Sequence, residues 1–139
     1  MPEASLVRTV RFSAGHHYGR PDWSDEENRR VFGSAVHPHG HNWALTVTVR
    51  GPVDPETGFV VDLGELDTLL RTEVVERFDQ RDLNEEVAPV REGAMQPTTE
   101  ALARWLYERL APRIPGTARL VRVRLAESHD LAAEYRGSA

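Results

Sequence analysis

Two segments in the first half of the chain alternate apolar and polar residues. The alternation is loose over residues 6–14 and strict over residues 39–49, where the apolar positions are Trp43, Leu45, Val47 and Val49. A period of two residues predicts strands whose alternate side chains face a core. Residues 18–38, between these strands, are polar and irregular. They form a longer connection than is usual in a compact domain, and such loops often carry function.

The middle of the chain shows the helical period instead. A first helix is expected over residues 63–77, and Asp62 is placed to cap its N-terminus. A second helix is expected after Thr98, whose hydroxyl can cap it, and Pro112 and Pro115 lie where it ends. The apolar faces of the two helices are Leu63, Leu66, Leu70 and Val74, and Leu102, Trp105, Leu106 and Leu110.

The strand period returns near the end of the chain. Residues 120–127 alternate, with Val121, Val123 and Leu125 on one face, and residues 131–135 form a short second strand after a tight link at 128–130. The predicted order is β-β-α-α-β-β. We therefore expect an α+β fold in which an antiparallel four-stranded sheet carries two helices on one face. Residues 1–139 are expected to form a single domain.

Composition narrows the function classes. A formal net charge of -5 gives no broad basic surface for nucleic acid, although local basic patches can still bind phosphorylated small molecules. No apolar stretch approaches the roughly 18 residues of a membrane span, and the first residues do not resemble a signal peptide, so we expect a cytoplasmic protein without a membrane partner. The absence of cysteine excludes disulfides, thiolate metal ligands and a thiol nucleophile.

Three histidines are candidate metal ligands. His39 and His41 are two residues apart on a predicted strand, so both imidazoles face one side, as ligands of a common metal must. Taken alone, this pair is equally consistent with two partly exposed histidines at a strand start. His16 ends the first predicted strand, which is expected to pair with the strand of His39 and His41. A set of three histidines leaves a fourth zinc position open, as in catalytic sites.

Other polar residues permit both a functional and an ordinary interpretation. Glu127 follows an apolar strand face and can recognise the N–H groups of a ligand or form a rim ion pair. Asp79 follows the first helix and is either a general base or part of a solvated charged turn. Thr98 and Thr99 first indicate a helix start, where free backbone N–H groups can also hold a polar ligand.

Short motifs spread over nearly the whole chain carry a family resemblance. They include Phe-Ser-Ala-Gly-His at 12–16, His-Gly-His-Asn-Trp at 39–43, Asp-Leu-Gly-Glu-Leu at 62–66, Pro-Thr-Thr-Glu at 97–100 and Ala-Glu-Ser at 126–128. In this order and spacing, the chain resembles the 6-pyruvoyl-tetrahydropterin synthase and 6-carboxytetrahydropterin synthase family.

The resemblance implies a T-fold subunit that assembles into a homo-oligomer. Subunits of the family join in trimers whose sheets close into a barrel, and two trimers can stack. It also implies a bound zinc ion (Zn²⁺) and a small pterin-like substrate, whose amino-pyrimidine edge a carboxylate can hold through two parallel N–H bonds. The matched positions are His16, His39 and His41 for zinc, Glu127 for the pterin edge, and Thr98 and Thr99 for further pterin contacts.

Two departures from the family pattern concern proton transfer. Ala35 stands where the family usually has its catalytic cysteine, and Gln80 stands where it has a histidine. A glutamine side chain cannot exchange a proton as histidine does. Family variants that cleave the side chain have a glutamate where Val36 stands here. Asp79, His129 and His37 can take over proton transfer, and we take Asp79 and His129 as the candidate catalytic residues; His129 is alternatively an exposed turn histidine.

Three functional hypotheses remain. The first is a zinc-dependent carbon–oxygen lyase of the synthase type, acting on 7,8-dihydroneopterin triphosphate or a related pterin, with its standard activity weak or replaced. The second keeps the fold and the zinc but performs another reaction, such as aldol-type cleavage or a step on a non-pterin metabolite. The third is a non-catalytic pterin-binding protein, which has no obvious need of the three histidines.

Overall fold

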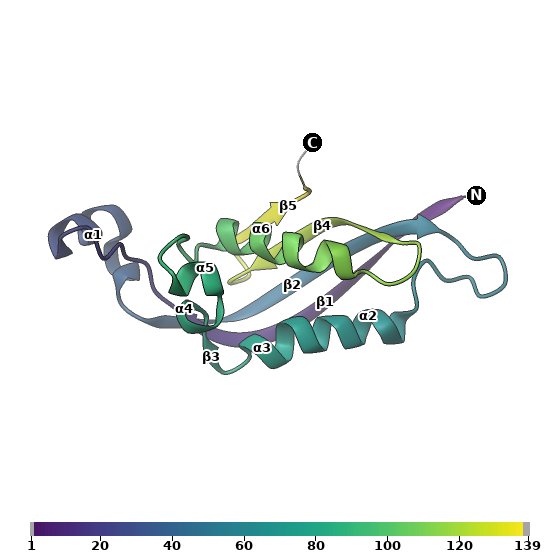
Figure 1. Ribbon diagram of the computed structural model, residues 1–139, viewed down its shortest axis with the longest axis horizontal. Coiled ribbons are helices and arrows are strands. Elements are labelled where there is room, and N and C mark those ends of the chain that lie inside the picture. Colours follow the sequence, from purple (N-terminus) through teal and green to yellow (C-terminus); the bar gives the residue numbers. More distant parts are fainter. Residues whose placement is uncertain (1, 138–139) are drawn as a thin grey trace.

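The sheet is built on one long antiparallel pair of strands. The computed structural model describes residues 2–137, and its five strands run in the order β3-β1-β2-β4-β5 (Figure 1). Their bounds are Glu3–His16 for β1, His39–Pro52 for β2, Arg81–Asp82 for β3, Arg119–Ala126 for β4 and Ala132–Tyr135 for β5. The register of β1 and β2 sets His16 opposite His39. The four predicted strands are confirmed, and β3 adds a fifth that is too short for alternation to reveal.

Both predicted helices cover the same face of the sheet (Figure 1). The first combines α2 (Leu63–Leu70), a π-helical section (Arg71–Val75) and α3 (Glu76–Phe78), and the second is α6 (Thr99–Leu110). The two predicted N-caps are confirmed, because Asp62 accepts from the Glu65 backbone N–H at 3.0 Å and Thr98 from that of Ala101 at 3.1 Å. The short helices α4 (Leu83–Glu86) and α5 (Ala88–Arg91) and a 3₁₀ turn (Ala111–Arg113) complete this layer.

The core lies between the sheet and these helices. The four predicted apolar positions of β2 are fully buried, as are Leu66 and Leu70, whereas Leu63 at the helix start is 44% exposed. On β4, Val121 was expected on the buried face of the strand together with Val123 and Leu125. This expectation is wrong, because Leu120 is buried instead of Val121. A β-bulge causes this shift, because Thr48 pairs with Arg122 while the next residue of β2 pairs with Leu120.

The segment predicted to be irregular contains helical structure. Helix α1 (Asp25–Phe32) has Ser24 as its N-cap and is followed by a 3₁₀ turn (Gly33–Val36). None of the residues of α1 is buried, so the core imposes no apolar pattern on it that could be recognised in the sequence. Figure 1 shows α1 projecting beyond the end of the sheet where β1 and β2 carry their histidines.

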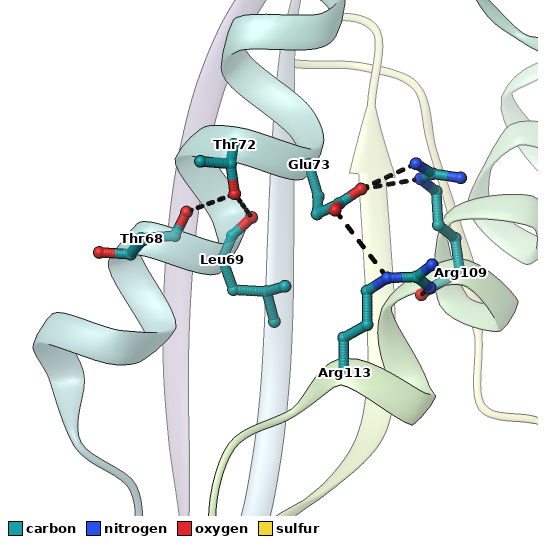
Figure 2. A network of polar contacts seen from close by, with 6 residues as sticks. All are labelled: Thr68, Leu69, Thr72, Glu73, Arg109 and Arg113. Atoms are coloured by element: carbon teal, nitrogen blue, oxygen red, sulfur yellow. Dashed lines mark hydrogen bonds and ion pairs between the residues drawn. The ribbon is translucent and has the colours of Figure 1, made fainter.

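A half-buried polar network fastens the first helix to α6 (Figure 2). The carboxylate of Glu73, in the π-helical section, accepts bonds of 2.8 and 3.1 Å from the guanidinium of Arg109 and lies 3.9 Å from Arg113 Nε. The Thr72 hydroxyl donates to the Thr68 carbonyl at 2.8 Å. The helical layer is thereby held on one face, and the other face of the sheet is left open. Among the described residues, no helix is both long and apolar enough to cross a membrane.

Candidate functional site

The structure brings the three candidate metal ligands together at one end of the sheet. His16 is the last residue of β1 and His39 the first of β2, and His41 lies two residues further along β2 on the same face. Their ring centroids are 4.6 Å apart for His16 and His39, 5.1 Å for His16 and His41, and 5.0 Å for His39 and His41. One nitrogen from each ring can be chosen so that all lie within 4.8 Å of one another.

The hydrogen bonds of the rings leave nitrogen lone pairs free. Nδ1 of His16 lies 2.8 Å from the Pro97 carbonyl oxygen, and Nδ1 of His39 lies 2.8 Å from that of His37. Because a carbonyl oxygen only accepts, each Nδ1 carries a proton, and in the neutral form of each ring Nε2 then has a lone pair. Burial also lowers the pKa of His16, which favours the neutral ring that a metal requires.

The unpaired nitrogens fit a metal ion. The Nε2 atoms of His16 and His41 are buried without a hydrogen-bond partner, which is costly unless something binds them. Three neutral imidazoles with a further position open form a donor set that suits Zn²⁺. These residues therefore fit the ion that the family resemblance implies.

Aromatic side chains surround the histidines. Trp43 is fully buried, its centroid lies 5.0 Å from that of His16 and 5.3 Å from that of His41, and its Nε1–H donates to the Ala14 carbonyl at 3.1 Å. The Tyr18 ring packs 5.1 Å from His16, and burial raises the pKa of Tyr18 to about 12. Sequence reasoning missed Tyr18, although its position two residues after His16 was an available signal. These rings pack against His16, which is buried, whereas His39 and His41 are partly exposed.

Glu127 connects the histidines to helix α6. Its Oε1 accepts from the Thr99 hydroxyl at 2.9 Å, and its Oε2 lies 2.8 Å from His41 Nε2, although the angles there do not make a hydrogen bond. The Glu127 side chain is only 10% exposed. The structure thus gathers Glu127 and Thr99 with the histidines, while the neighbouring Thr98 hydroxyl is used by the helix cap.

The two candidate catalytic residues lie in different settings. Asp79 Oδ1 accepts from the Ser13 backbone N–H at 2.8 Å, so its carboxylate is held against the backbone of β1. His129 is exposed in the link between β4 and β5, and it lines a hollow of about 810 Å³ together with His41 and Glu127. His129 thus shares this hollow with residues of the site, and Asp79 is not among the residues that line it.

Both positions that depart from the family pattern flank the histidines. The carbonyl of Ala35 accepts from the Tyr18 backbone N–H at 2.9 Å, which places residue 35 beside the ring that packs on His16. Gln80 has a left-handed backbone with φ of 64°, and it lines a hollow of about 430 Å³ together with His41. Residue 35 is thus linked through Tyr18 to His16, and Gln80 shares a hollow with His41.

Comparison with known proteins finds similar sequences and structures. The family model for 6-pyruvoyl tetrahydropterin synthase matches residues 5–138. A Drosophila melanogaster 6-pyruvoyl tetrahydrobiopterin synthase is 36% identical, over 98% of this chain and 81% of the relative. The solved Caenorhabditis elegans 6-pyruvoyl tetrahydropterin synthase shares 31% identity and a TM-score of 0.90, over 99% of this chain and 98% of that one.

A further relative carries a different activity in its name. A dihydroneopterin monophosphate aldolase of Pyrococcus furiosus is 28% identical, over 95% of this chain and 96% of the relative. The likeness to the Caenorhabditis elegans structure confirms the expected α+β T-fold. The chain belongs to the 6-pyruvoyl tetrahydropterin synthase family.

Proposed function

We propose that this protein is a zinc-dependent lyase that acts on 7,8-dihydroneopterin triphosphate or a closely related phosphorylated pterin. The observation that carries the proposal is the position of Glu127, which contacts the Thr99 hydroxyl and lies 2.8 Å from His41 Nε2. A pterin held by this carboxylate would lie directly beside the histidines. The family match over residues 5–138 supports a single domain with this function.

In this proposal His16, His39 and His41 hold the zinc. When bound there, zinc supplies a Lewis acid that polarises an oxygen of the substrate side chain and acidifies the adjacent C–H group. The carbonyls of Pro97 and His37 fix the ring orientation of His16 and His39 by accepting from their Nδ1–H groups.

Glu127 is proposed to anchor the amino-pyrimidine edge of the pterin. A carboxylate offers two acceptor oxygens in one plane, which matches two parallel N–H donors. The Thr99 hydroxyl donates to one of these oxygens and therefore acts as a positioning residue for Glu127. The side chain of Thr98 is occupied by the N-cap, so a contact from Thr98 to the pterin would use its backbone.

Proton transfer must be assigned to other residues than in the family pattern. Neither Ala35 nor Gln80 can exchange a proton, and the loss of a general base typically costs about 10²–10⁴ in rate. We assign the role of base to His129, because it shares a hollow with Glu127 and His41. Asp79 is the second candidate. It ranks below His129 because its carboxylate is already engaged as the acceptor of the Ser13 backbone N–H.

Aldol-type cleavage of the pterin side chain is a second candidate function. Two observations favour it, namely the missing thiol at position 35 and the relative named dihydroneopterin monophosphate aldolase, which aligns over 95% of this chain. This reaction uses the same zinc and the same anchor and differs in which bond of the side chain breaks. Pterin binding without catalysis is the third candidate.

One experiment separates these functions. The purified protein is loaded with zinc and incubated with 7,8-dihydroneopterin triphosphate, and the release of triphosphate and the pterin products are followed. Triphosphate release with a rearranged side chain supports the synthase-type lyase, whereas a pterin with a shortened, unphosphorylated side chain, formed together with a two-carbon aldehyde that keeps the triphosphate, supports cleavage. Tight binding of the substrate without turnover supports a non-catalytic pterin-binding protein. Absence of binding contradicts the proposal.

We also propose that the chain assembles in trimers, as the family resemblance implies. In the described part of the chain, β5 is the last strand at one edge of the sheet, and at the other edge β3 pairs only with Ala14 and Gly15 of β1, so sheets of neighbouring subunits can join along these edges. Light scattering after gel filtration tests this assembly. A mass of three or six chains supports it, and a monomer at micromolar concentration contradicts it.

A further inference from the structure

We propose that Tyr18 is a substrate-contacting residue, whose hydroxyl donates a hydrogen bond to the substrate oxygen that lies beside the three histidines. This inference rests on the proposed function and deepens it by naming a group that recognises the side chain of the substrate. The Tyr18 ring packs edge-on against His16, with centroids 5.1 Å apart, and against His39 at 6.4 Å. Tyr18 therefore borders the place at which the histidines would hold a ligand.

The chain on both sides of Tyr18 is held by side-chain amides. The amide of Asn84 accepts from the His17 backbone N–H at 2.9 Å and donates to the His17 carbonyl at 3.0 Å. The amide of Gln96 does the same with Gly19, at 3.0 and 2.9 Å. Each amide thus forms the pair of bonds that a neighbouring strand would form. The backbone that carries the Tyr18 ring is therefore fixed before any ligand binds, as a precise contact requires.

The hydroxyl of Tyr18 is free. Within residues 2–137 it forms no hydrogen bond. A tyrosine O–H group that is partly buried usually has a partner, so the packing of the ring leaves this hydroxyl unexplained. Burial, followed by the charges of Glu127 and Glu100, raises the pKa of Tyr18 to about 12, which places the hydroxyl within the field of both carboxylates. A free donor thus lies on the side of the proposed pterin anchor.

The loop opposite Tyr18 contributes two apolar side chains. The Tyr18 backbone N–H donates to the Ala35 carbonyl at 2.9 Å, and Tyr18 and Val36 line a common hollow of about 480 Å³. Neither an alanine nor a valine side chain can donate a hydrogen bond to a ligand. Tyr18 therefore supplies a polar group that these two neighbours lack.

A donor at this place also serves the reaction. When His129, the proposed base, takes a proton from the C–H group next to the substrate oxygen, negative charge develops on that oxygen. A hydrogen bond that is already in place stabilises this charge, and the loss of one such donor typically costs about 10²–10³ in kcat. Glu127 and Tyr18 thus recognise different parts of the substrate, namely the pterin edge and the side chain.

Acetohydroxamate tests the contact without any pterin, because its two adjacent oxygens can bind a metal centre with an open position. It is titrated calorimetrically into the zinc-loaded wild-type protein, into Tyr18→Phe and into Tyr107→Phe. Tyr107 is the matched control, because its hydroxyl donates to the Leu120 carbonyl at 3.1 Å. Tyr18→Phe keeps the ring that packs on His16 and should keep its zinc.

The Tyr18→Phe protein should bind acetohydroxamate about five- to tenfold more weakly, as expected when one neutral hydrogen bond is lost, and Tyr107→Phe should bind it as the wild type does. Zinc content is measured on all three proteins. Equal binding by the three proteins, no binding by the wild type, or loss of zinc from Tyr18→Phe would overturn the contact.

A second titration separates the contact from the proposed function. 7,8-Dihydroneopterin and 7,8-dihydropterin, which lacks the side chain, are compared on the same three proteins. Tyr18→Phe should lose about five- to tenfold in affinity for the first compound and none for the second. If both compounds bind and Tyr18→Phe weakens neither, or weakens both equally, the contact is wrong while the pterin function stands. If neither pterin binds and acetohydroxamate still depends on Tyr18, the contact stands and the proposed function fails.

Discussion

Glu127 Oε2 lies 2.8 Å from Nε2 of His41, so a carboxylate from the end of β4 meets an imidazole from the start of β2. The register of β2 and β4 stops at the pair of Ala44 and Ala126, one residue before Glu127 and three residues from His41. The contact therefore lies just beyond the end of the pairing between β2 and β4, while the histidines are still paired between β1 and β2. The same contact makes Glu127 the residue whose change is most informative about ligand binding.

Replacing Glu127 with Gln should weaken pterin binding much more than it weakens the fold. An amide offers one acceptor and one donor, so one N–H group of the ligand edge would face a donor, at a cost of roughly 1–3 kcal/mol. Direct titration with 7,8-dihydroneopterin measures the effect, and urea unfolding monitors the fold. Glu100→Gln, an exposed acid one residue after Thr99, is the matched control. Equal affinity of Glu127→Gln and the wild type would argue against a pterin pocket.

The adjacent threonines should separate stability from ligand binding. Thr98→Ala removes the hydroxyl that caps α6 and should lower the free energy of unfolding by about 0.5–2 kcal/mol. Thr99→Val removes the donor to Glu127 in a buried position of similar shape, so it should mainly lower pterin affinity. Both quantities are measured on both variants. The reverse pattern would show that Thr98, rather than Thr99, supports the ligand.

Restoring the family residues at both altered positions tests the cause of the departure. If the pocket still fits 7,8-dihydroneopterin triphosphate, Ala35→Cys combined with Gln80→His should raise synthase activity by about 10²–10⁴. Each single change should gain much less, because groups that act as one relay are strongly non-additive. Release of triphosphate is the measurement. A folded, zinc-loaded double variant without any gain would show that the pocket serves another reaction.

The ion pair between Glu73 and Arg109 should contribute measurably to stability. Both side chains are 23% exposed, and Glu73→Gln should lower the free energy of unfolding by roughly 1–2 kcal/mol because a half-buried guanidinium loses its charged partner. The control is Glu108→Gln, whose partner Arg104 is 65% exposed, with an expected loss of about 0.3–0.5 kcal/mol. Urea unfolding at fixed protein concentration compares them. Equal losses would mean that burial does not strengthen this pair.

The parts of the fold that the sequence predicted are those that the core dictates. The strict alternation of β2 and the apolar faces of both long helices follow from one-sided burial, and the caps at Asp62 and Thr98 are local chemistry. Helix α1 was missed because none of its residues is buried. The bulge at Val121 was missed because one extra residue shifts the face of a strand without changing its composition.

The site was predictable to the extent that it depends on strand geometry. His16, His39 and His41 converge because an antiparallel register and a two-residue period decide where each ring lies. A backbone hydrogen bond joins Tyr18 to Ala35, a residue distant in the sequence, and a pattern of apolar and polar residues does not encode such a contact. The Pro97 carbonyl that orients His16 is likewise 81 residues away along the chain.

Metal content tests the central claim most directly. Zinc is measured by mass spectrometry in the mildly purified wild-type protein, in His41→Ala and in His129→Ala, whose exposed side chain is not a proposed ligand. We predict about one zinc per chain in the wild type and in His129→Ala, because three neutral imidazoles with an open position bind this ion well, and a nearly empty site in His41→Ala. A wild-type protein that binds no zinc when supplied with it, or a His41→Ala protein that keeps full occupancy, would contradict the account.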